Sequence, residues 1–541
     1  MDSQTLPYHW DDRARLYSDH QYLTEVYERY LAALYPRLNH IHRINQSERF
    51  WRVVVGPWLQ YFIEIFYDRY LSIRAAAETG SVTDTLIGDV ARESAPLDFS
   101  DFNRQFTSDS YNQYLYSWII EQTKCVPFRV SSQEGPYDEK ASSRPTTREV
   151  ISIWLSRIGH AVPADWNRVS LITTQLPHSA LIQLNRALGQ FPWLAAPAIP
   201  VRKLPPNRDM RQGLMLQQGA DSFEQLLDRI IPQQIPVAHV ESFAELQKAS
   251  LRSFPAEPKV IVTSAAEAFD EGFKVWAATQ VDKGATLSIS QHGGFFGSGR
   301  WISTENHQLK ISRHYYSWGW SDEAFPSIKP MPALKLVGVK KRIRWSGSGQ
   351  ILWALTSIPR YSYRMLSIPV AGQFAAYLED QFRFARALPA EIQRKITLRL
   401  YPHDYGWNEE RRWGDQFPNL RVHKGNVPMD DELSESSLFI GTYNATTFLE
   451  TLAADFPTLI FWNPKHWELR PTAEPFYDHL RDAGIFHTTP ESAANKLEEI
   501  WADPMKWWKT ANVQQVRAEF CDRFARTSEN WIQDWKSELS R

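Results

Sequence analysis

The second half of the chain alternates short apolar runs with helical stretches, and this alternation constrains the fold more than any other feature. An apolar run at 259–263 is followed by a helical stretch at 267–280 and a second apolar run at 286–290. A strand, a helix and a strand in this order are typical of a parallel sheet built from βαβ units. The alternation begins again further on, with predicted strands at 351–355, 395–400, 420–423, 438–440 and 458–461 and predicted helices at 373–388 and 445–454. The sequence therefore predicts two Rossmann-like parallel sheets.

Helical patterns flank this α/β region at both ends. Apolar residues recur at spacings of three and four between 11 and 34, and again after Pro57, which suits the first turn of a helix. The tail at 491–539 is also helical in pattern and rich in tryptophan. Segment 131–148 lacks periodicity and is predicted to be a surface loop. We expect a helix-rich and then Rossmann-like domain at 1–340, a second Rossmann-like domain at 341–510, and terminal helices at 511–541.

A basic stretch joins the two α/β regions. Between residues 329 and 378 there are eight Lys and Arg and no Asp or Glu, and Ser346-Gly347-Ser348-Gly349 within it has the composition of a hinge. Two interpretations stay open. The stretch contacts a diphosphate, a lipid-linked acceptor or the anionic surface of the inner membrane, or it is a solvated face with a hinge.

The composition of the chain and the motifs that it lacks exclude several classes of function. A chain of 541 residues is too long for a single hydrophobic core, so we expect two large domains. The 60 basic and 62 acidic residues give a net charge of −2, which does not favour nucleic-acid binding. Two cysteines, no secretory signal and no apolar run long enough to span a bilayer predict a cytoplasmic protein. There is no HExxH motif, Walker loop or GxSxG elbow, so we expect no metal and disfavour peptidases, kinases and α/β-hydrolases.

A glycine-rich loop follows the predicted strand at 286–290. Four glycines in the nine residues 291–299 allow backbone N–H groups to approach a phosphate. His292 is a candidate proton acceptor, and Gln291, Gly293 and Gly294 are candidate phosphate-binding residues. The alternative is a tight turn with a capping histidine. The loop is not a GxGxxG fingerprint, so NAD is not favoured.

A second polar loop follows the strand at 395–400. Arg399 and His403 are candidate ligands for an anionic group, and Asp404 is placed in the sequence to orient the imidazole and fix its tautomer. The alternative is that these side chains serve the structure alone.

The third loop, at 442–447, lies between the predicted strand at 438–440 and a helix start. Free N–H groups at a helix N-terminus bind anions without any lysine. Glu450, about one turn into the helix, suits the vicinal hydroxyls of a ribose or sugar. The alternative is an ordinary capping turn, in which Thr446 or Thr447 caps the helix and Glu450 offsets the helix dipole. The candidate donor-binding residues of this loop are Thr442, Tyr443, Asn444, Thr446 and Thr447.

These three loops carry a resemblance to a known family. The blocks SISQHGGFFGSGRW, RLYPHDYGW and SLFIGTYNATTFLETLAADFPTLIFW resemble transferases encoded with bacterial O-antigen and surface-polysaccharide genes. The blocks HWDDRARLYSDHQYL and FWRVVVGPWLQYFIEIFYDRYLSI look like the same family, so the resemblance covers most of the chain. More widely, the chain is similar to two-domain GT-B glycosyltransferases, including capsule Kdo transferases and teichoic-acid-type polymerases.

The resemblance implies a fold and a set of roles. The two Rossmann-like domains would face a cleft, and the 442–447 turn with Glu450 would hold a nucleotide donor. His403 would match the family's His-Pro element, although the order here is Pro402-His403. Arg399 and His403 would stabilise charge on the leaving phosphate, and His292 is the first candidate for the general base.

The expected function is a cytoplasmic glycosyltransferase of surface-polysaccharide assembly. It would move a sugar from a nucleotide-activated donor to a glycan or lipid-linked acceptor, with no cofactor beyond that substrate. Three alternatives stay open: a polyol-phosphate transferase on the same fold, a sugar-nucleotide epimerase, and a non-catalytic scaffold that binds a glycan or a partner.

Overall fold

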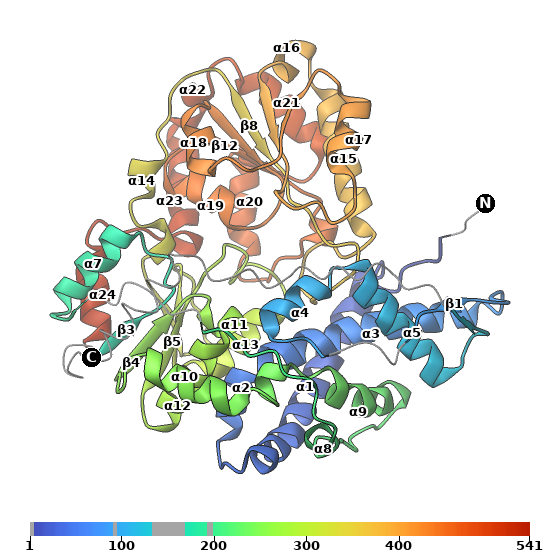
Figure 1. Ribbon diagram of the computed structural model, residues 1–541. Helices are drawn as coiled ribbons and strands as arrows, with labels where there is room; N and C mark the ends of the chain where they lie inside the picture. Colours follow the sequence, from blue (N-terminus) through green and yellow to red (C-terminus); the bar gives the residue numbers. More distant parts are fainter. Residues whose placement is uncertain (1–4, 90–94, 132–167, 192–198, 541) are drawn as a thin grey trace.

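The structure, a computed structural model, describes residues 5–89, 95–131, 168–191 and 199–540 (Figure 1). Apart from Ser131, the surface loop predicted at 131–148 lies outside these residues. Two separate parallel sheets, both flanked by helices, make up the α/β part of the chain. The predicted fold class, α/β with two Rossmann-like sheets and helices at both ends, is confirmed.

The first sheet has five parallel strands in the order β3-β4-β5-β6-β7, which is also their order along the chain. The predicted strands at 259–263 and 286–290 are its second and third members. Its strands are β3 (Val169–Leu171), β4 (Val260–Thr263), β5 (Thr286–Ser290), β6 (His314–Ser317) and β7 (Ile328–Pro330). Besides two helices between β4 and β5, the helices between these strands are α7 (His178–Ala187), α8 (Arg208–Gln212), α9 (Ser222–Gln234), α10 (Phe243–Ser253) and α13 (Ser303–Ile311). Short 3-10 turns lie at Val237–His239, before β4, and at Leu334–Leu336, after β7.

The helix predicted at 267–280 is divided in two. Helix α11 (Ala266–Phe269) ends at Asp270, and α12 (Glu271–Asp282) begins directly after it. The carboxylate of Asp270 accepts a hydrogen bond from the Phe273 amide at 2.9 Å. Aspartate is a favoured N-cap, so this residue ends one helix and starts the next.

The second sheet has six parallel strands in the order β10-β9-β8-β11-β12-β13. Helices α15 and α21 cover one face, while α19, α20 and α23 (Ala511–Phe524) cover the other. Its strands are β8 (Ile351–Ala354), β9 (Ile396–Arg399), β10 (Arg421–His423), β11 (Leu438–Gly441), β12 (Thr458–Phe461) and β13 (Phe486–His487). Its helices are α14 (Val339–Arg342), α15 (Gln373–Ala387), α16 (Ala390–Gln393), α17 (Glu409–Gln416), α18 (Met429–Ser434), α19 (Thr446–Ala453), α20 (Glu474–Asp482), α21 (Pro490–Ile500) and α22 (Pro504–Trp508).

Alternate side chains of the second sheet enter different cores. In β8, Ile351 and Trp353 join one hydrophobic cluster, and Leu352 and Ala354 join another that extends into the first sheet and the N-terminal helices. Successive residues of a strand point to opposite faces, and a parallel sheet is covered on both. One continuous hydrophobic core therefore joins the two halves of the molecule.

The N-terminal helices pack against both halves. They are α1 (Arg13–His42), α2 (Glu48–Val54), α3 (Gly56–Glu78), α4 (Phe99–Gln105) and α5 (Asp109–Thr123), with a short pair of strands, β1 (Leu86–Ile87) and β2 (Arg129–Val130). Helix α2 packs on α12 beside the first sheet (Figure 1). Helix α3 reaches the second sheet's loops, where Glu64 accepts a hydrogen bond from the Met365 amide at 2.8 Å. The guanidinium of Arg69, also on α3, donates to the Ser362 carbonyl.

The last helix returns to the first sheet. Helix α24 (Trp531–Leu539) packs against α7, far from the second sheet that precedes it in the sequence (Figure 1). The indole of Trp535 donates to the Pro332 carbonyl at 3.0 Å and meets the Tyr316 ring edge-on at 4.9 Å. The chain therefore runs from the first half to the second and ends on the first.

Candidate functional site

The strand order of the second sheet reverses between β8 and β11. From β8 the chain continues through β9 to β10 on one side, and from β11 through β12 to β13 on the other. In open parallel sheets, ligands bind outside the carboxyl ends of the strands at such a reversal. The loops that flank it are 355–372, after β8, and 442–445, after β11. The predicted third loop therefore lies at the position that this rule selects.

The glycine loop of the first sheet meets this position. The Gly294 amide donates to the Thr446 hydroxyl at 3.0 Å, and the Asn444 amide group donates to the Ser298 hydroxyl at 3.2 Å. A Cβ added to Gly294 would lie 2.5 Å from the carbonyl oxygen of Ala445. Glycine is therefore needed here for close approach between the two halves. The structure brings the first and third predicted loops together.

The side chain of Gln291 forms hydrogen bonds inside the glycine loop and to the segment after β6. Its side-chain amide donates to the Gly293 carbonyl at 2.7 Å. Its side-chain oxygen accepts the Trp318 amide at 2.9 Å and the Trp320 indole N–H at 2.8 Å. These contacts fix the path of the loop on both sides of His292.

His292 lies against Phe296, with the two ring centroids 4.7 Å apart. Its Nδ1 atom is buried and has no hydrogen-bond partner among the residues that the structure describes. Burial, together with smaller contributions from the positive charges of Arg364 and Lys335, lowers the pKa of His292 to about 4. The imidazole is therefore neutral at physiological pH and has a ring nitrogen free to accept a proton.

The turn after β11 is held by its own side chains. The Thr442 hydroxyl is 2.6 Å from the Tyr377 hydroxyl and donates to the Ala354 carbonyl at 3.1 Å. Asn444 accepts a hydrogen bond from the Tyr477 hydroxyl at 2.9 Å, and the Tyr443 hydroxyl is 2.9 Å from that of Thr447. Thr442 and Asn444 are fully buried.

Helix α19 begins at this turn without a side-chain cap. Its N-cap is Ala445, so neither Thr446 nor Thr447 caps the helix as the alternative interpretation expects. The N–H groups of the first turn of a helix have no partner within the helix itself. One turn on, the carboxylate of Glu450 lies 3.6 Å from the Lys335 ammonium. Burial raises the pKa of Glu450, while Lys335 opposes that shift.

The second predicted loop is arranged differently from the sequence expectation. The Arg399 guanidinium pairs with Glu432 and donates to the carbonyls of Val427, at 2.8 Å, and Gly425, at 2.9 Å. The Asp404 carboxylate accepts hydrogen bonds from the backbone amides of residues 406, 407 and 408 at 2.9, 2.8 and 3.1 Å, so it holds the loop's own backbone. His403 is exposed beside Tyr405.

Arg364, in the loop after β8, is a charged residue that the sequence reasoning did not select. Its guanidinium lies over the Tyr363 ring at 4.8 Å, and its buried Nε has no hydrogen-bond partner in the described part of the chain. Arg364 belongs to the basic stretch at 329–378, which the sequence analysis interpreted as a whole without selecting a single residue. Within that stretch four side chains pair with carboxylates from elsewhere: Lys329 with Glu538, Lys335 with Glu450, Arg342 with Asp430 and Arg360 with Asp109.

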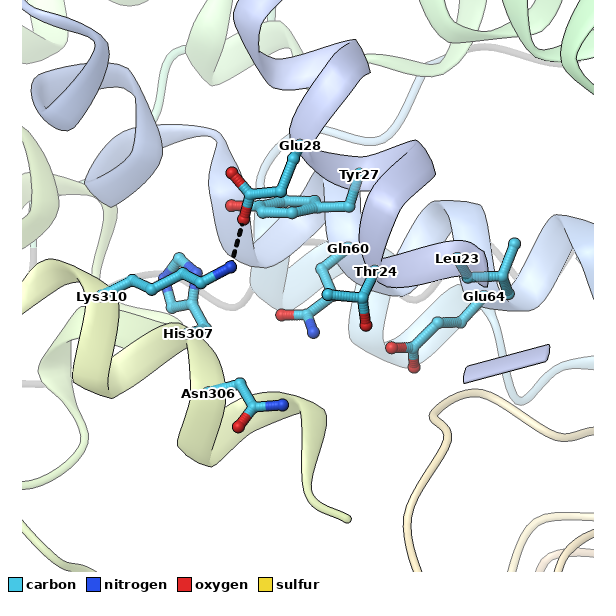
Figure 2. A pocket seen from close by; sticks show the side chains of 9 residues that line it. All are labelled: Leu23, Thr24, Tyr27, Glu28, Gln60, Glu64, Asn306, His307 and Lys310. Atoms are coloured by element: carbon cyan, nitrogen blue, oxygen red, sulfur yellow. Dashed lines mark hydrogen bonds and ion pairs between the residues drawn. The ribbon is translucent and has the colours of Figure 1, made fainter. Parts of the chain in front are cut away.

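A small pocket lies between α1, α3 and α13 (Figure 2). Its volume of about 20 Å³ has room for about one water molecule. Lys310 and Glu28 form an ion pair at its edge, 2.5 Å apart, and Glu64 points toward it from α3 (Figure 2). Within the described ranges, no group of three or more His, Cys, Asp or Glu could hold a metal ion, and no helix is long and apolar enough to cross a bilayer.

Comparison with known proteins identifies the class. Residues 1–539 match the LIC12162 family of transferases, so the chain belongs to that family. A comparison with curated proteins finds no match. Among solved structures, a variant of the wall teichoic acid polymerase TagF has 11% identity and a TM-score of 0.28, over 53% of this chain and 74% of that one. MurG of Acinetobacter baumannii has 12% identity and a TM-score of 0.31, over 69% of this chain and 98% of that one.

Proposed function

We propose that this transferase is a glycosyltransferase. It moves a sugar from a nucleotide-activated donor to a hydroxyl of a growing surface polysaccharide of O-antigen or capsule type, in the cytoplasm. The observation that supports this most is the contact between the His292 loop and the start of α19, at the reversal of strand order in the second sheet. A phosphate-binding turn and a neutral histidine thus come from opposite halves of the molecule.

The donor binds on the side of the second sheet. The uncapped N–H groups at the start of α19 bind a phosphate of the donor, because they carry partial positive charge and lack partners within the helix. Thr446 and Thr447 are partly exposed at this turn. Glu450, one turn further on, accepts hydrogen bonds from vicinal hydroxyls of the ribose or the sugar.

The transfer is a single exchange of bonds at the anomeric carbon of the donor sugar. The acceptor's hydroxyl oxygen forms a bond to this carbon, and the carbon's bond to the phosphate oxygen breaks. The electron pair of the broken bond remains on the leaving phosphate. The hydroxyl proton passes to the imidazole of His292, which is neutral in the free protein.

A thermal-shift panel of CMP-, UDP-, GDP- and dTDP-sugars tests the proposal. One nucleotide class should raise the melting temperature, because a ligand that binds only the folded state stabilises it. Glu450→Ala should weaken that donor about 10- to 100-fold, the worth of a hydrogen bond to a charged group. Glu498→Ala, an exposed helical glutamate of the same sheet's α21, is the matched control. Binding of no donor by folded protein would contradict the proposal.

Product analysis then separates the two transfer reactions. Incubation of the donor with an acceptor glycan should give a new glycosidic bond and a free nucleotide. A new phosphodiester bond would replace the proposal with polyol-phosphate transfer on the same fold.

A further inference from the structure

Arg364 is a partly buried cation that has no carboxylate ion-pair partner among the residues that the structure describes. Among the ion pairs of the described residues, none includes Arg364, whereas four other cations of the same basic stretch have acidic partners. Its guanidinium lies over the face of Tyr363 and near the hydroxyl of Tyr61, both neutral groups. Its charge also acts on the buried Glu64, whose raised pKa keeps that carboxyl group protonated at neutral pH. Burying an unpaired charge is unfavourable, so such a cation is expected to have a counterion in the working protein.

The loop that carries Arg364 is held in place from two directions. On one side, the carboxyl group of Glu64 on α3 accepts a hydrogen bond from the Met365 amide at 2.8 Å. On the other, the Trp301 amide donates to the Ser367 hydroxyl at 3.0 Å, and Ile302 pairs with Leu366 in an antiparallel bridge. Arg364 is therefore fixed between the N-terminal helices and the segment that follows the glycine loop.

The same loop follows β8, the neighbour of β11, and so flanks the strand-order reversal. The charge of Arg364 acts on His292 of the glycine loop. Lys335, in the segment before β8, lies 3.6 Å from Glu450 of α19. Glu450 and Thr446, four residues apart, lie on one face of α19, and Thr446 contacts Gly294. Lys335 and the His292 loop are thus neighbours along this helix face.

We propose that Arg364, together with Lys335, binds the diphosphate of the donor and takes up the negative charge that remains on the leaving phosphate, an inference that rests on the proposed function. A guanidinium matches two phosphate oxygens at once. Arg399, which the sequence assigns to this role, already has Glu432 and two carbonyls as partners.

A consequence for His292 follows from this assignment. In the free protein, burial lowers the pKa of His292, and the charges of Arg364 and Lys335 lower it further. A bound diphosphate offsets both positive charges, so the pKa of His292 rises and the imidazole becomes a stronger base. The base is therefore strengthened only when the donor is in place.

Isothermal titration with inorganic pyrophosphate tests the site without assuming a nucleotide or a sugar. Wild-type protein should bind pyrophosphate, and Arg364→Gln should weaken the binding at least tenfold. Arg364→Lys should retain part of it, because the charge remains and the two-pronged geometry is lost. Arg383→Gln, on the outer helix α15 where the guanidinium pairs with Glu491, is the matched control and should bind as wild type does. If Arg364→Gln fails to fold, Arg364→Lys should bind three- to tenfold more weakly than wild type.

Two outcomes overturn this inference and leave the proposed function standing. One is equal pyrophosphate affinity in wild type and in the folded Arg364 variants. The other is a nucleotide-sugar that binds wild type and Arg364→Gln equally. A third outcome, in which pyrophosphate binds and depends on Arg364 while no nucleotide-sugar binds, contradicts the proposed function and keeps the anion site.

Discussion

Glu64 gives the sharpest test of how the N-terminal helices support the second half of the molecule. The residue is 4% exposed, and one carboxyl oxygen accepts a hydrogen bond from the Met365 amide at 2.8 Å. Burial raises the pKa of Glu64 from 4.5 to about 8, against opposing contributions led by the Met365 amide. The group is therefore protonated in the folded protein at neutral pH and ionised in the unfolded chain.

The sign of the pH dependence follows from these two pKa values. Between about pH 4.5 and pH 8 the folded state binds more protons at this site than the unfolded state. The contribution of Glu64 to the free energy of unfolding is complete below pH 4.5 and is lost as the pH rises through 8, by up to about 1.4 kcal/mol per pH unit. Glu64→Gln removes this titration and keeps an oxygen that can accept the Met365 amide.

Urea unfolding of wild type and Glu64→Gln at pH 5 and pH 8 measures the effect. Other groups titrate alike in both proteins, so the difference between them isolates Glu64. The variant should gain roughly 3 kcal/mol relative to wild type between the two pH values. Glu498→Gln, an exposed glutamate, should gain nothing. Equal gains for the two variants would refute the assignment of a raised pKa to Glu64.

Two further substitutions test contacts that join parts of the chain. Gly294→Ala places a Cβ 2.5 Å from the Ala445 carbonyl oxygen and should cost about 1–3 kcal/mol in urea unfolding. Gly293→Ala, whose Cβ meets nothing closer than 3.5 Å, is its control, and equal losses would argue against a tight contact. Trp535→Ala removes a side chain that is 1% exposed and should cost about 3–5 kcal/mol. A loss no larger than that of the partly buried Trp531→Ala would show that α24 contributes little.

Much of the α/β fold could be predicted because apolar strands buried on both faces leave a clear pattern. All five strands predicted from 351 onward are present, within a residue or two of their expected ends. The short strands β3, β6, β7 and β13 were not predicted. Their two to four residues include polar or aromatic runs such as His314–Ser317, and pairing with a neighbouring strand, rather than local pattern, makes them strands.

The candidate site was only partly accessible from the sequence. The position of each loop could be predicted, because the carboxyl ends of the strands share one edge of a parallel sheet. The partners of each side chain could not be predicted from the sequence. Arg399 finds Glu432 from α18, and Lys335 finds Glu450 from α19, through folding that brings distant segments together. The roles assigned to His292, His403, Asp404 and the 442–447 turn stay predictions for the experiments above.

The return of α24 sets an order in which the molecule is completed during synthesis. Strands β3 to β7 leave the ribosome before the second sheet, but Trp535, whose ring packs against Tyr316 of β6, is made only after the whole second sheet. Lys329 likewise waits for Glu538 to form its ion pair at 2.5 Å. Until then one side of the first sheet presents aromatic surface and an unpaired lysine to the solvent. The half of the protein that is synthesised first is the half that is finished last.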